Sequence, residues 1–494
     1  MFGWLKNINN IISNLNKNID LYKKETIIQS LPSKSYVNRA KKFIEKNDYI
    51  SAEAILKEAL ELSPKDALVY KYLGVVYERT AKPELALENY QLSADLDPHD
   101  KNVWQRLGFM LISVGKYENA EKSFDNANKI QAGNSDTYTG WGMALMKMQK
   151  FSEAHDKFLH ASKLNKYNYS ALFLSAVMEI KLGIYDKADS KLAFLTKVSP
   201  NESNTFEYAR LKALRDDIDS AISYALKSIK YNSKMLPAYI LLGQLYGKKL
   251  DKTEALNYFE KAETLGFNNP NLYLEWGKIL VKFENFTDAK EKLLKANELL
   301  PNDNDIMANL GLCYASCKDF IEAEQFLNRV IEKDNDNAVV KQTLGIIAYE
   351  KGEYDKALAI LKHNDEDAIN CYYIAKCYEK KSNNTKTIEY YEASIRLNDK
   401  NINTYIDYTN YLITKNEYAE AQRKLRKALK IDEDNITLLN LMFYVSYILV
   451  KDNICDYNLK EVLLLASKIE HKGIFNYPEQ KQELENILQE REKH

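Results

Sequence analysis

The stretch from Trp141 to Ala161 reads WGMALMKMQKFSEAHDKFLHA and decides the fold, because its pattern returns at a fixed distance. The chain reads LGFMLISVGKYENAEKSFDNA over 107–127, 34 residues earlier, and LGVVYERTAKPELALENYQLS over 73–93, another 34 residues earlier. A catalytic or cofactor site is normally built once, whereas a packing arrangement can be copied. The repetition therefore predicts a helical solenoid and identifies 141–161 as a packing motif.

A recurring alanine follows the repeat through most of the chain. It lies at Ala52, Ala86, Ala120, Ala154, Ala188, Ala221, Ala255, Ala289, Ala323, Ala357 and Ala421. The steps are 34 residues, apart from one of 33 and a final gap of 64 that Thr387 divides into 30 and 34. Twelve units are therefore expected between about 33 and 435. Seven glycines stand twelve residues before one of these alanines, at Gly74, Gly108, Gly142, Gly243, Gly277, Gly311 and Gly345.

Each unit contains two apolar stripes of helical period separated by a polar turn. In the unit 270–303 the stripes are Tyr273, Trp276, Leu280 and Phe283, then Phe286, Ala289, Leu293 and Ala296. A proline closes several units, at Pro64, Pro98, Pro200 and Pro301, where it ends the second helix. The small residues allow the two helices to approach closely, and we expect Trp141 or Trp276 to pack beside them.

These residues resemble the tetratricopeptide repeat. One unit shows the family pattern as Tyr70, Leu73, Gly74, Tyr77, Ala86, Tyr90, Ser93 and Pro98. The resemblance implies an all-α fold of about 12–13 stacked helical hairpins in a right-handed superhelix with terminal capping helices. It also implies that the first helix of each unit, helix A, lines a concave groove; the second is called helix B.

Departures from the repeat suggest four segments. Residues 1–32 form an N-terminal amphipathic or capping helix, and 33–367 form an array of about ten repeats. The last of these repeats is short, because its helix B is cut at LAILKHNDED. Residues 368–471 continue the array with about three repeats, the last degenerate, and 472–494 form a C-terminal capping helix that carries Leu484, Ile487 and Leu488 on one face.

The N-terminal segment allows two interpretations. Its apolar face consists of Ile8, Ile11, Ile12, Leu15, Ile19 and Tyr22. It either caps the first hairpin or lies on a membrane surface, led by Phe2, Trp4 and Leu5. Few lysines accompany this face, which weakens attraction to anionic lipid. No window resembles a transmembrane helix or a secretory signal, so a cytoplasmic location is expected, with peripheral membrane contact as the alternative.

Charge and composition restrict the chemistry. The chain has 69 Lys and Arg against 70 Asp and Glu, which argues against a non-specific nucleic-acid grip. No phosphate loop, zinc protease motif or nucleophile elbow occurs, so we expect no catalytic residues and no cofactor. Cys313 and Cys377 share one repeat position and are expected to pack in the core rather than to bind metal. His155 and His160 are expected on the surface.

The groove is where a ligand is expected. In the resembled family, ligands usually meet helix A at its second, fifth, ninth and twelfth places. The family clamp for acidic C-termini needs an asparagine where this chain has Val75, after Lys71, so the clamp is absent. The candidates for partner binding are Lys71, Gln105, Phe109, Thr139, Met143, Phe173, Val177, Ile240, Gln244, Leu274, Lys278, Tyr372 and Tyr373. Some of them are equally explained by packing against a neighbouring unit.

The sequence thus predicts a non-enzymatic scaffold or adaptor that binds protein or peptide segments in its concave groove. Two alternatives stay open. The first alternative is a regulatory or targeting arm of an enzyme or secretion complex in another chain. The second is a peripheral membrane scaffold tethered by the N-terminal helix.

Overall fold

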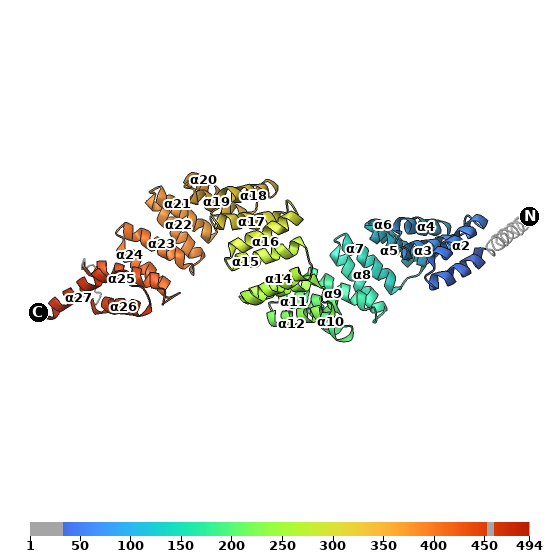
Figure 1. Cartoon of the computed structure of the whole chain (residues 1–494), viewed down its shortest axis with the longest axis horizontal. Coiled ribbons are helices and arrows are strands. Elements are labelled where there is room, and N and C mark those ends of the chain that lie inside the picture. Colours follow the sequence, from blue (N-terminus) through green and yellow to red (C-terminus); the bar gives the residue numbers. More distant parts are fainter. Residues whose placement is uncertain (1–32, 452–458, 494) are drawn as a thin grey trace, which may run out of the picture. The chain divides into compact units, whose positions relative to one another are not determined.

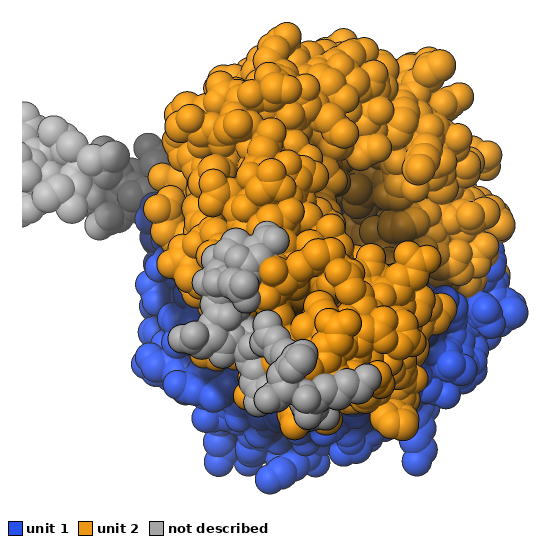
Figure 2. All heavy atoms as spheres, turned by 90° about the vertical axis from the view of Figure 1, so that its left-hand side faces the viewer, with its two compact units in different colours: residues 1–265 blue, residues 266–494 orange. Residues whose placement is uncertain are grey.

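The computed structural model describes residues 33–451 and 459–493, in which helices alternate with short turns and no strand occurs (Figure 1). The fold is an all-α repeat solenoid, as the sequence predicts. The chain divides into two compact units, the first ending at Leu265 and the second beginning at Gly266 (Figure 2). The predicted N-terminal helix, 1–32, lies outside the described residues.

Unit 1 opens with a helix over residues 33–45, whose partner is the first labelled helix. The labelled helices are α2 (Tyr49–Leu62), α3 (Ala67–Arg79), α4 (Pro83–Leu96), α5 (Lys101–Ser113), α6 (Tyr117–Ile130), α7 (Ser135–Lys147), α8 (Phe151–Leu164), α9 (Tyr169–Lys181), α10 (Tyr185–Val198), α11 (Glu202–Leu214), α12 (Ile218–Tyr231), α13 (Leu236–Lys248) and α14 (Lys252–Thr264). From α3 onward, odd-numbered helices are helix A of a unit and even-numbered helices are helix B.

Unit 2 continues the alternation. Its helices are α15 (Pro270–Lys282), α16 (Phe286–Leu299), α17 (Asn304–Ser316), α18 (Phe320–Lys333), α19 (Ala338–Glu350), α20 (Tyr354–Leu361), the short 3-10 helix η1 (Lys362–Asn364), α21 (Ala368–Lys380), α22 (Asn384–Leu397), α23 (Ile402–Thr414), α24 (Tyr418–Leu429), α25 (Ile436–Lys451), α26 (Leu459–Lys472) and α27 (Pro478–Lys493). The expected thirteenth hairpin is formed by α25 and α26, which pack together.

Capping side chains fix where most A helices begin. Asp66, Asp100, Asn134 and Asn168 precede successive A helices, and each side chain accepts a backbone N–H from the first turn. Such a cap satisfies a donor that would otherwise lack a partner. At the other end of the hairpin, Pro64, Pro98, Pro200 and Pro301 directly follow the C-cap residue of helix B, which confirms the predicted stop.

The recurring glycine lies against a large residue of helix B sixteen positions later. A Cβ at Gly142 would lie 2.6 Å from the Phe158 ring, and one at Gly277 would lie 2.5 Å from Leu293 Cγ. The space that this glycine leaves is taken by Phe158, while Trp141 packs against the cluster that contains Ala154 and Phe158. The ring that needs the space comes from the next helix, because the crossing of α7 and α8 places Phe158 directly over Gly142.

Two segments of unit 2 depart from the regular repeat, one at α20 and one at the C-terminal helix α27. Helix α20 is only eight residues long and passes into η1, which confirms the shortened helix B. The predicted block boundary between 367 and 368 stays a prediction. In α27, Leu484 is fully buried against α25 and α26, and Ile487 and Leu488 pack beside it.

Cysteine packing agrees with the repeat. Cys313 and Cys377 are fully buried, and burial raises the pKa of each thiol to about 12, which keeps both protonated at neutral pH. In the described part of the chain, no group of His, Cys, Asp and Glu is placed to hold a metal ion. Within the same residues, each helix falls short of the length or the apolar character needed to cross a bilayer.

Candidate functional site

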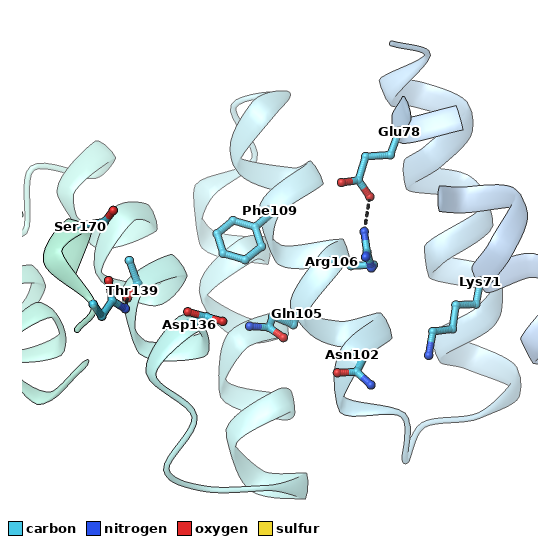
Figure 3. A pocket seen from close by; sticks show the side chains of 10 residues that line it. Lys71, Glu78, Asn102, Gln105, Arg106, Phe109, Asp136, Thr139 and Ser170 are labelled. Carbon is cyan, nitrogen blue, oxygen red and sulfur yellow. Dashed lines mark hydrogen bonds and ion pairs between the residues drawn. The ribbon is translucent and has the colours of Figure 1, made fainter. Parts of the chain in front are cut away.

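A concave pocket of about 580 Å³ lies over successive A helices of unit 1 (Figure 3). Its lining residues are Lys71, Glu78, Asn102, Gln105, Arg106, Phe109, Asp136, Thr139, Asn168 and Ser170. The structure thus brings together four of the residues predicted for the groove, namely Lys71, Gln105, Phe109 and Thr139. They come from α3, α5 and α7.

Helical geometry explains why these residues share the pocket. Asn102, Gln105 and Phe109 stand at i, i+3 and i+7 on α5, a spacing that places side chains on one helix face. The caps of α5 and α7 start both helices at equivalent positions, so Asp136 and Thr139 take the same places on α7 as Asn102 and Gln105 on α5. The 34-residue spacing between successive repeats therefore places these side chains along one pocket wall.

The ammonium of Lys71 is tied to the next helix. Its Nζ donates to Asp100 Oδ2 at 2.7 Å, and the two side chains are only 15% and 21% exposed. Asp100 Oδ1 meanwhile accepts the backbone N–H of Asn102 at 2.9 Å as the cap of α5. One carboxylate therefore both starts α5 and neutralises Lys71.

A second ion pair closes one side of the pocket. Arg106 Nη1 donates to Glu78 Oε2 at 2.8 Å, and the hydroxyl of the buried Tyr90 donates to the same oxygen at 2.6 Å. Burial, together with this bond to Glu78, raises the pKa of Tyr90 far above its usual 10.0, so the phenol stays protonated. The Arg106 charge is thus balanced by a carboxylate that is itself held in place.

Thr139 is also hydrogen-bonded by a residue of the next repeat. Asn168 Nδ2 donates to Thr139 Oγ1 at 3.0 Å, while Asn168 Oδ1 caps α9 by accepting the N–H of Ala171 at 2.9 Å. The fifth-place side chain of α7 therefore braces the following cap, as Lys71 does on α3. In unit 2, Gln342 does the same by donating to the cap Asp367 at 2.7 Å.

Other lining groups are open. Within the described residues, the side chains of Asn102, Gln105, Asp136 and Ser170 make no hydrogen bond or ion pair. Asn102, Asp136 and Ser170 are exposed, and Gln105 is half-buried. These amides, a hydroxyl and a carboxylate are the polar groups that a ligand in the pocket would contact.

Phe109 adds a half-buried aromatic ring to the same wall. It packs edge-on against Phe124, with ring centroids 5.1 Å apart. Gly140 makes room for both rings, because a Cβ there would lie 2.9 Å from Phe109 Cζ and 2.4 Å from Phe124 Cζ. The ring is therefore held rigidly, with one part left facing the pocket.

The remaining candidates in unit 1 lie outside this pocket. Met143, Phe173 and Val177 are half-buried and pack against the hydrophobic clusters between their helices. Ile240 on α13 is buried, and Gln244 is half-buried on the same helix. Their part in binding stays a prediction.

The candidates in unit 2 are engaged with neighbouring side chains. Leu274 is buried, and Lys278 pairs with Glu275 at 2.9 Å. Tyr372 donates its hydroxyl to Asp407, and burial together with this bond raises the pKa of Tyr372. Tyr373 packs edge-on against Tyr372 with centroids 5.1 Å apart.

Sequence reasoning did not select several lining residues. Ser170 is the second residue of its helix A, as Asn102 and Asp136 are of theirs. The family pattern of second, fifth, ninth and twelfth places, which selects Gln105, therefore also selects all three. Asn168 precedes its helix as a cap and Glu78 is recruited through Arg106, so only the capping contact and the ion pair reveal them.

The surface position expected for His155 is wrong. Its side chain is 12% exposed, and Nε2 lies 3.0 Å from Oε1 of Glu179, which is 1% exposed. Lys191 donates to the same Glu179 oxygen at 2.5 Å and to Ser175 Oγ at 2.7 Å. His160 is exposed, as expected, with its ring 4.3 Å from that of Tyr138.

Comparisons with known proteins agree with the repeat. Family models described as tetratricopeptide repeat match residues 37–101, 102–134, 236–266, 274–338 and 315–368. A TPR repeat-containing protein of Methanocaldococcus jannaschii is 27% identical over 287 residues, which are 52% of this chain and 50% of that protein. The anaphase-promoting complex subunit CDC16 of Saccharomyces cerevisiae is 23% identical over 248 residues, 49% of this chain and 28% of its own length. The chain therefore spans half or less of these curated relatives.

Two solved structures align with parts or most of this chain. A tetratricopeptide repeat protein of Parabacteroides merdae aligns with a TM-score of 0.41 and 20% identity, over 51% of this chain and 98% of that chain. A chain of an APC/C hetero-tetramer aligns with a TM-score of 0.46 and 12% identity, over 93% of this chain and 97% of its own.

Proposed function

Because this chain is a tetratricopeptide repeat protein, we propose that it is a non-enzymatic scaffold that holds an extended segment of a partner protein in the unit 1 pocket. The observation that carries the proposal is the set of open groups on a rigid wall. The amides of Asn102 and Gln105 lie beside the fixed ring of Phe109. Amides match the donors and acceptors of a peptide backbone, and a fixed ring offers an apolar anchor.

Rigidity supports this function as much as the open groups do. Lys71 and Thr139 are hydrogen-bonded to the capping residues of the following A helices, so each repeat holds the next one in place along the pocket wall. A wall that is already ordered loses little conformational entropy when a ligand binds.

One alternative has specific support. Several curated relatives are named as subunits of the anaphase-promoting complex, in yeasts and in Arabidopsis thaliana. Those names favour a role as a subunit that holds an assembly together, so a regulatory or targeting arm of an enzyme complex is the second candidate. The membrane-tethered alternative depends on residues 1–32, and the cytoplasmic location stays a prediction.

The test compares what full-length variants retain when they are purified from their own cells. The double variant Asn102→Ala and Gln105→Ala removes two amides without breaking a bond within the described residues. We expect the wild-type chain to carry one or two proteins at near-equal stoichiometry, and the variant to lose them. An unsatisfied polar group costs about 1–3 kcal/mol, so two lost amides weaken binding about tenfold or more.

The matched control is the double variant Asn119→Ala and Lys122→Ala, two exposed positions on α6 outside the pocket. It should retain the same proteins as the wild type. If no protein is retained by the wild type, or if the pocket variant and the control retain the same set, the proposal is wrong.

A further inference from the structure

The charges around the pocket are unequally available to a ligand. Lys71 is paired with Asp100, and Arg106 is paired with Glu78. An acidic ligand would have to displace one of these carboxylates before it could use either cation. The pocket is therefore poorly suited to a negatively charged segment, although two basic residues line it.

Asp136 differs from the other charged lining residues. It is exposed, it lines the pocket, and its carboxylate pairs with no described residue. Figure 3 shows Asp136 from α7 opposite Gln105 from α5, with the Phe109 ring on the same wall. A carboxylate, an amide oxygen and an aromatic face thus border one space.

These three groups match a basic side chain. A guanidinium or ammonium donates hydrogen bonds to a carboxylate and an amide oxygen, and it is attracted to the face of an aromatic ring. We propose that the pocket selects a protein segment that places a lysine or arginine against Asp136. This inference rests on the proposed function and names the chemistry of the segment.

Asp136 also lies in the first turn of α7, where a carboxylate favours the helix whatever the pocket binds. Asp305 provides the matched control, since it is exposed, lies at the same place in the first turn of α17, and belongs to unit 2. If replacing Asp136 alters peptide binding only by destabilising the start of its helix, replacing Asp305 should have the same effect. A change that acts through the ligand should be confined to Asp136.

The experiment uses three pools of fluorescein-labelled short peptides with uncharged mixed residues and a central arginine, leucine or glutamate. Binding to the full-length chain is measured by fluorescence anisotropy at low and high salt. The arginine pool should bind about tenfold more tightly than the glutamate pool, and salt should reduce that difference. Asp136→Lys should invert the preference, whereas Asp305→Lys should leave it as in the wild type.

Each other outcome has a definite meaning. Equal binding of the pools, or a preference for arginine that survives Asp136→Lys, overturns this inference. If the peptides bind in either of these ways and the double variant Asn102→Ala and Gln105→Ala weakens their binding, the pocket does bind peptides and the proposed function stands, but its selection of a basic segment through Asp136 is refuted. If none of the pools binds, the basic segment and the peptide-binding pocket are both refuted.

Discussion

The close crossing at Gly142 gives a stability prediction that follows directly from geometry. In Gly142→Ala the added methyl would lie 2.6 Å from the Phe158 ring, whereas ordinary van der Waals contact begins at 3.4 Å. Phe158 is fully buried, so its ring has no free space into which to move. Overpacking costs about 1–3 kcal/mol, and the added methyl would meet three atoms of the Phe158 ring at 2.6–3.0 Å, which places this site in the upper part of that range, at about 2–3 kcal/mol. Alanine recovers about 1 kcal/mol through its helix propensity, so we expect a net loss of about 1–2 kcal/mol.

Hydrogen exchange is the suitable assay, because a repeat array opens locally. Peptides that cover α7 and α8 should exchange about 5- to 30-fold faster in Gly142→Ala, which corresponds to that free energy. Peptides from unit 2 should be unchanged. Exchange in α7 and α8 as slow as in the wild type would refute the reasoning.

A second substitution tests the cause. The chain already has an alanine at the equivalent place in α9, Ala176, and the residue sixteen positions later is Leu192, buried in the same cluster. Adding Phe158→Leu to Gly142→Ala reproduces that pair and should restore part of the protection. The two changes together should cost less than their sum, by the 0.5–3 kcal/mol typical of residues in contact.

Three further predictions concern buried charge and capping. Burial raises the pKa of Glu207 above its usual 4.5, so the folded chain binds this proton more tightly than the unfolded chain. The stability that the proton provides is fully present below pH 4.5 and is lost as the pH rises through the folded pKa. Glu207→Gln should therefore raise the Tm at pH 7 and change it little near pH 4; an unchanged or lower Tm at pH 7 would contradict this. Asn337→Ala removes the cap that accepts the Val340 N–H at 3.1 Å and should cost about 1 kcal/mol in urea unfolding, with Asn337→Asp close to wild type. Lys424 is only 2% exposed and pairs with both Glu392 and Glu420. The double variant Glu392→Ala and Glu420→Ala leaves this buried charge without a carboxylate and should lower stability by about 3–5 kcal/mol, whereas an equal loss in Lys424→Met would show that the unpaired buried charge is not the cause.

The fold could be predicted because its causes are local. A small residue at a fixed place and apolar residues at helical spacing specify each hairpin, and copying the hairpin specifies the array. The partner of each glycine was the part that local pattern did not provide. Gly142 needs space for Phe158 of the following helix, and this contact depends on the angle at which two helices cross.

The site was less predictable, because side chains in the groove also serve the repeat itself. Lys71 and Thr139 occupy the expected places, yet each is bonded to a cap that follows 29 residues later. His155 was expected on the surface, like His160, because five residues is a poor spacing for two metal ligands on one helix and no other partner is evident nearby in the sequence. The partner that draws His155 inward is Glu179, 24 residues later, whose buried carboxylate occupies the place that Tyr77 has in an earlier repeat.

The central claim is that the unit 1 pocket holds a partner protein, and site-specific photocrosslinking in the native cells tests it most directly. A photoreactive residue at Ser170 lies in the pocket, and one at Lys122 on α6 lies outside it, with both positions exposed. The account predicts a discrete crosslinked protein from Ser170 that is absent from Lys122 and is lost when Asn102→Ala and Gln105→Ala are added. Identical crosslinks from both positions, or none from Ser170, would contradict it.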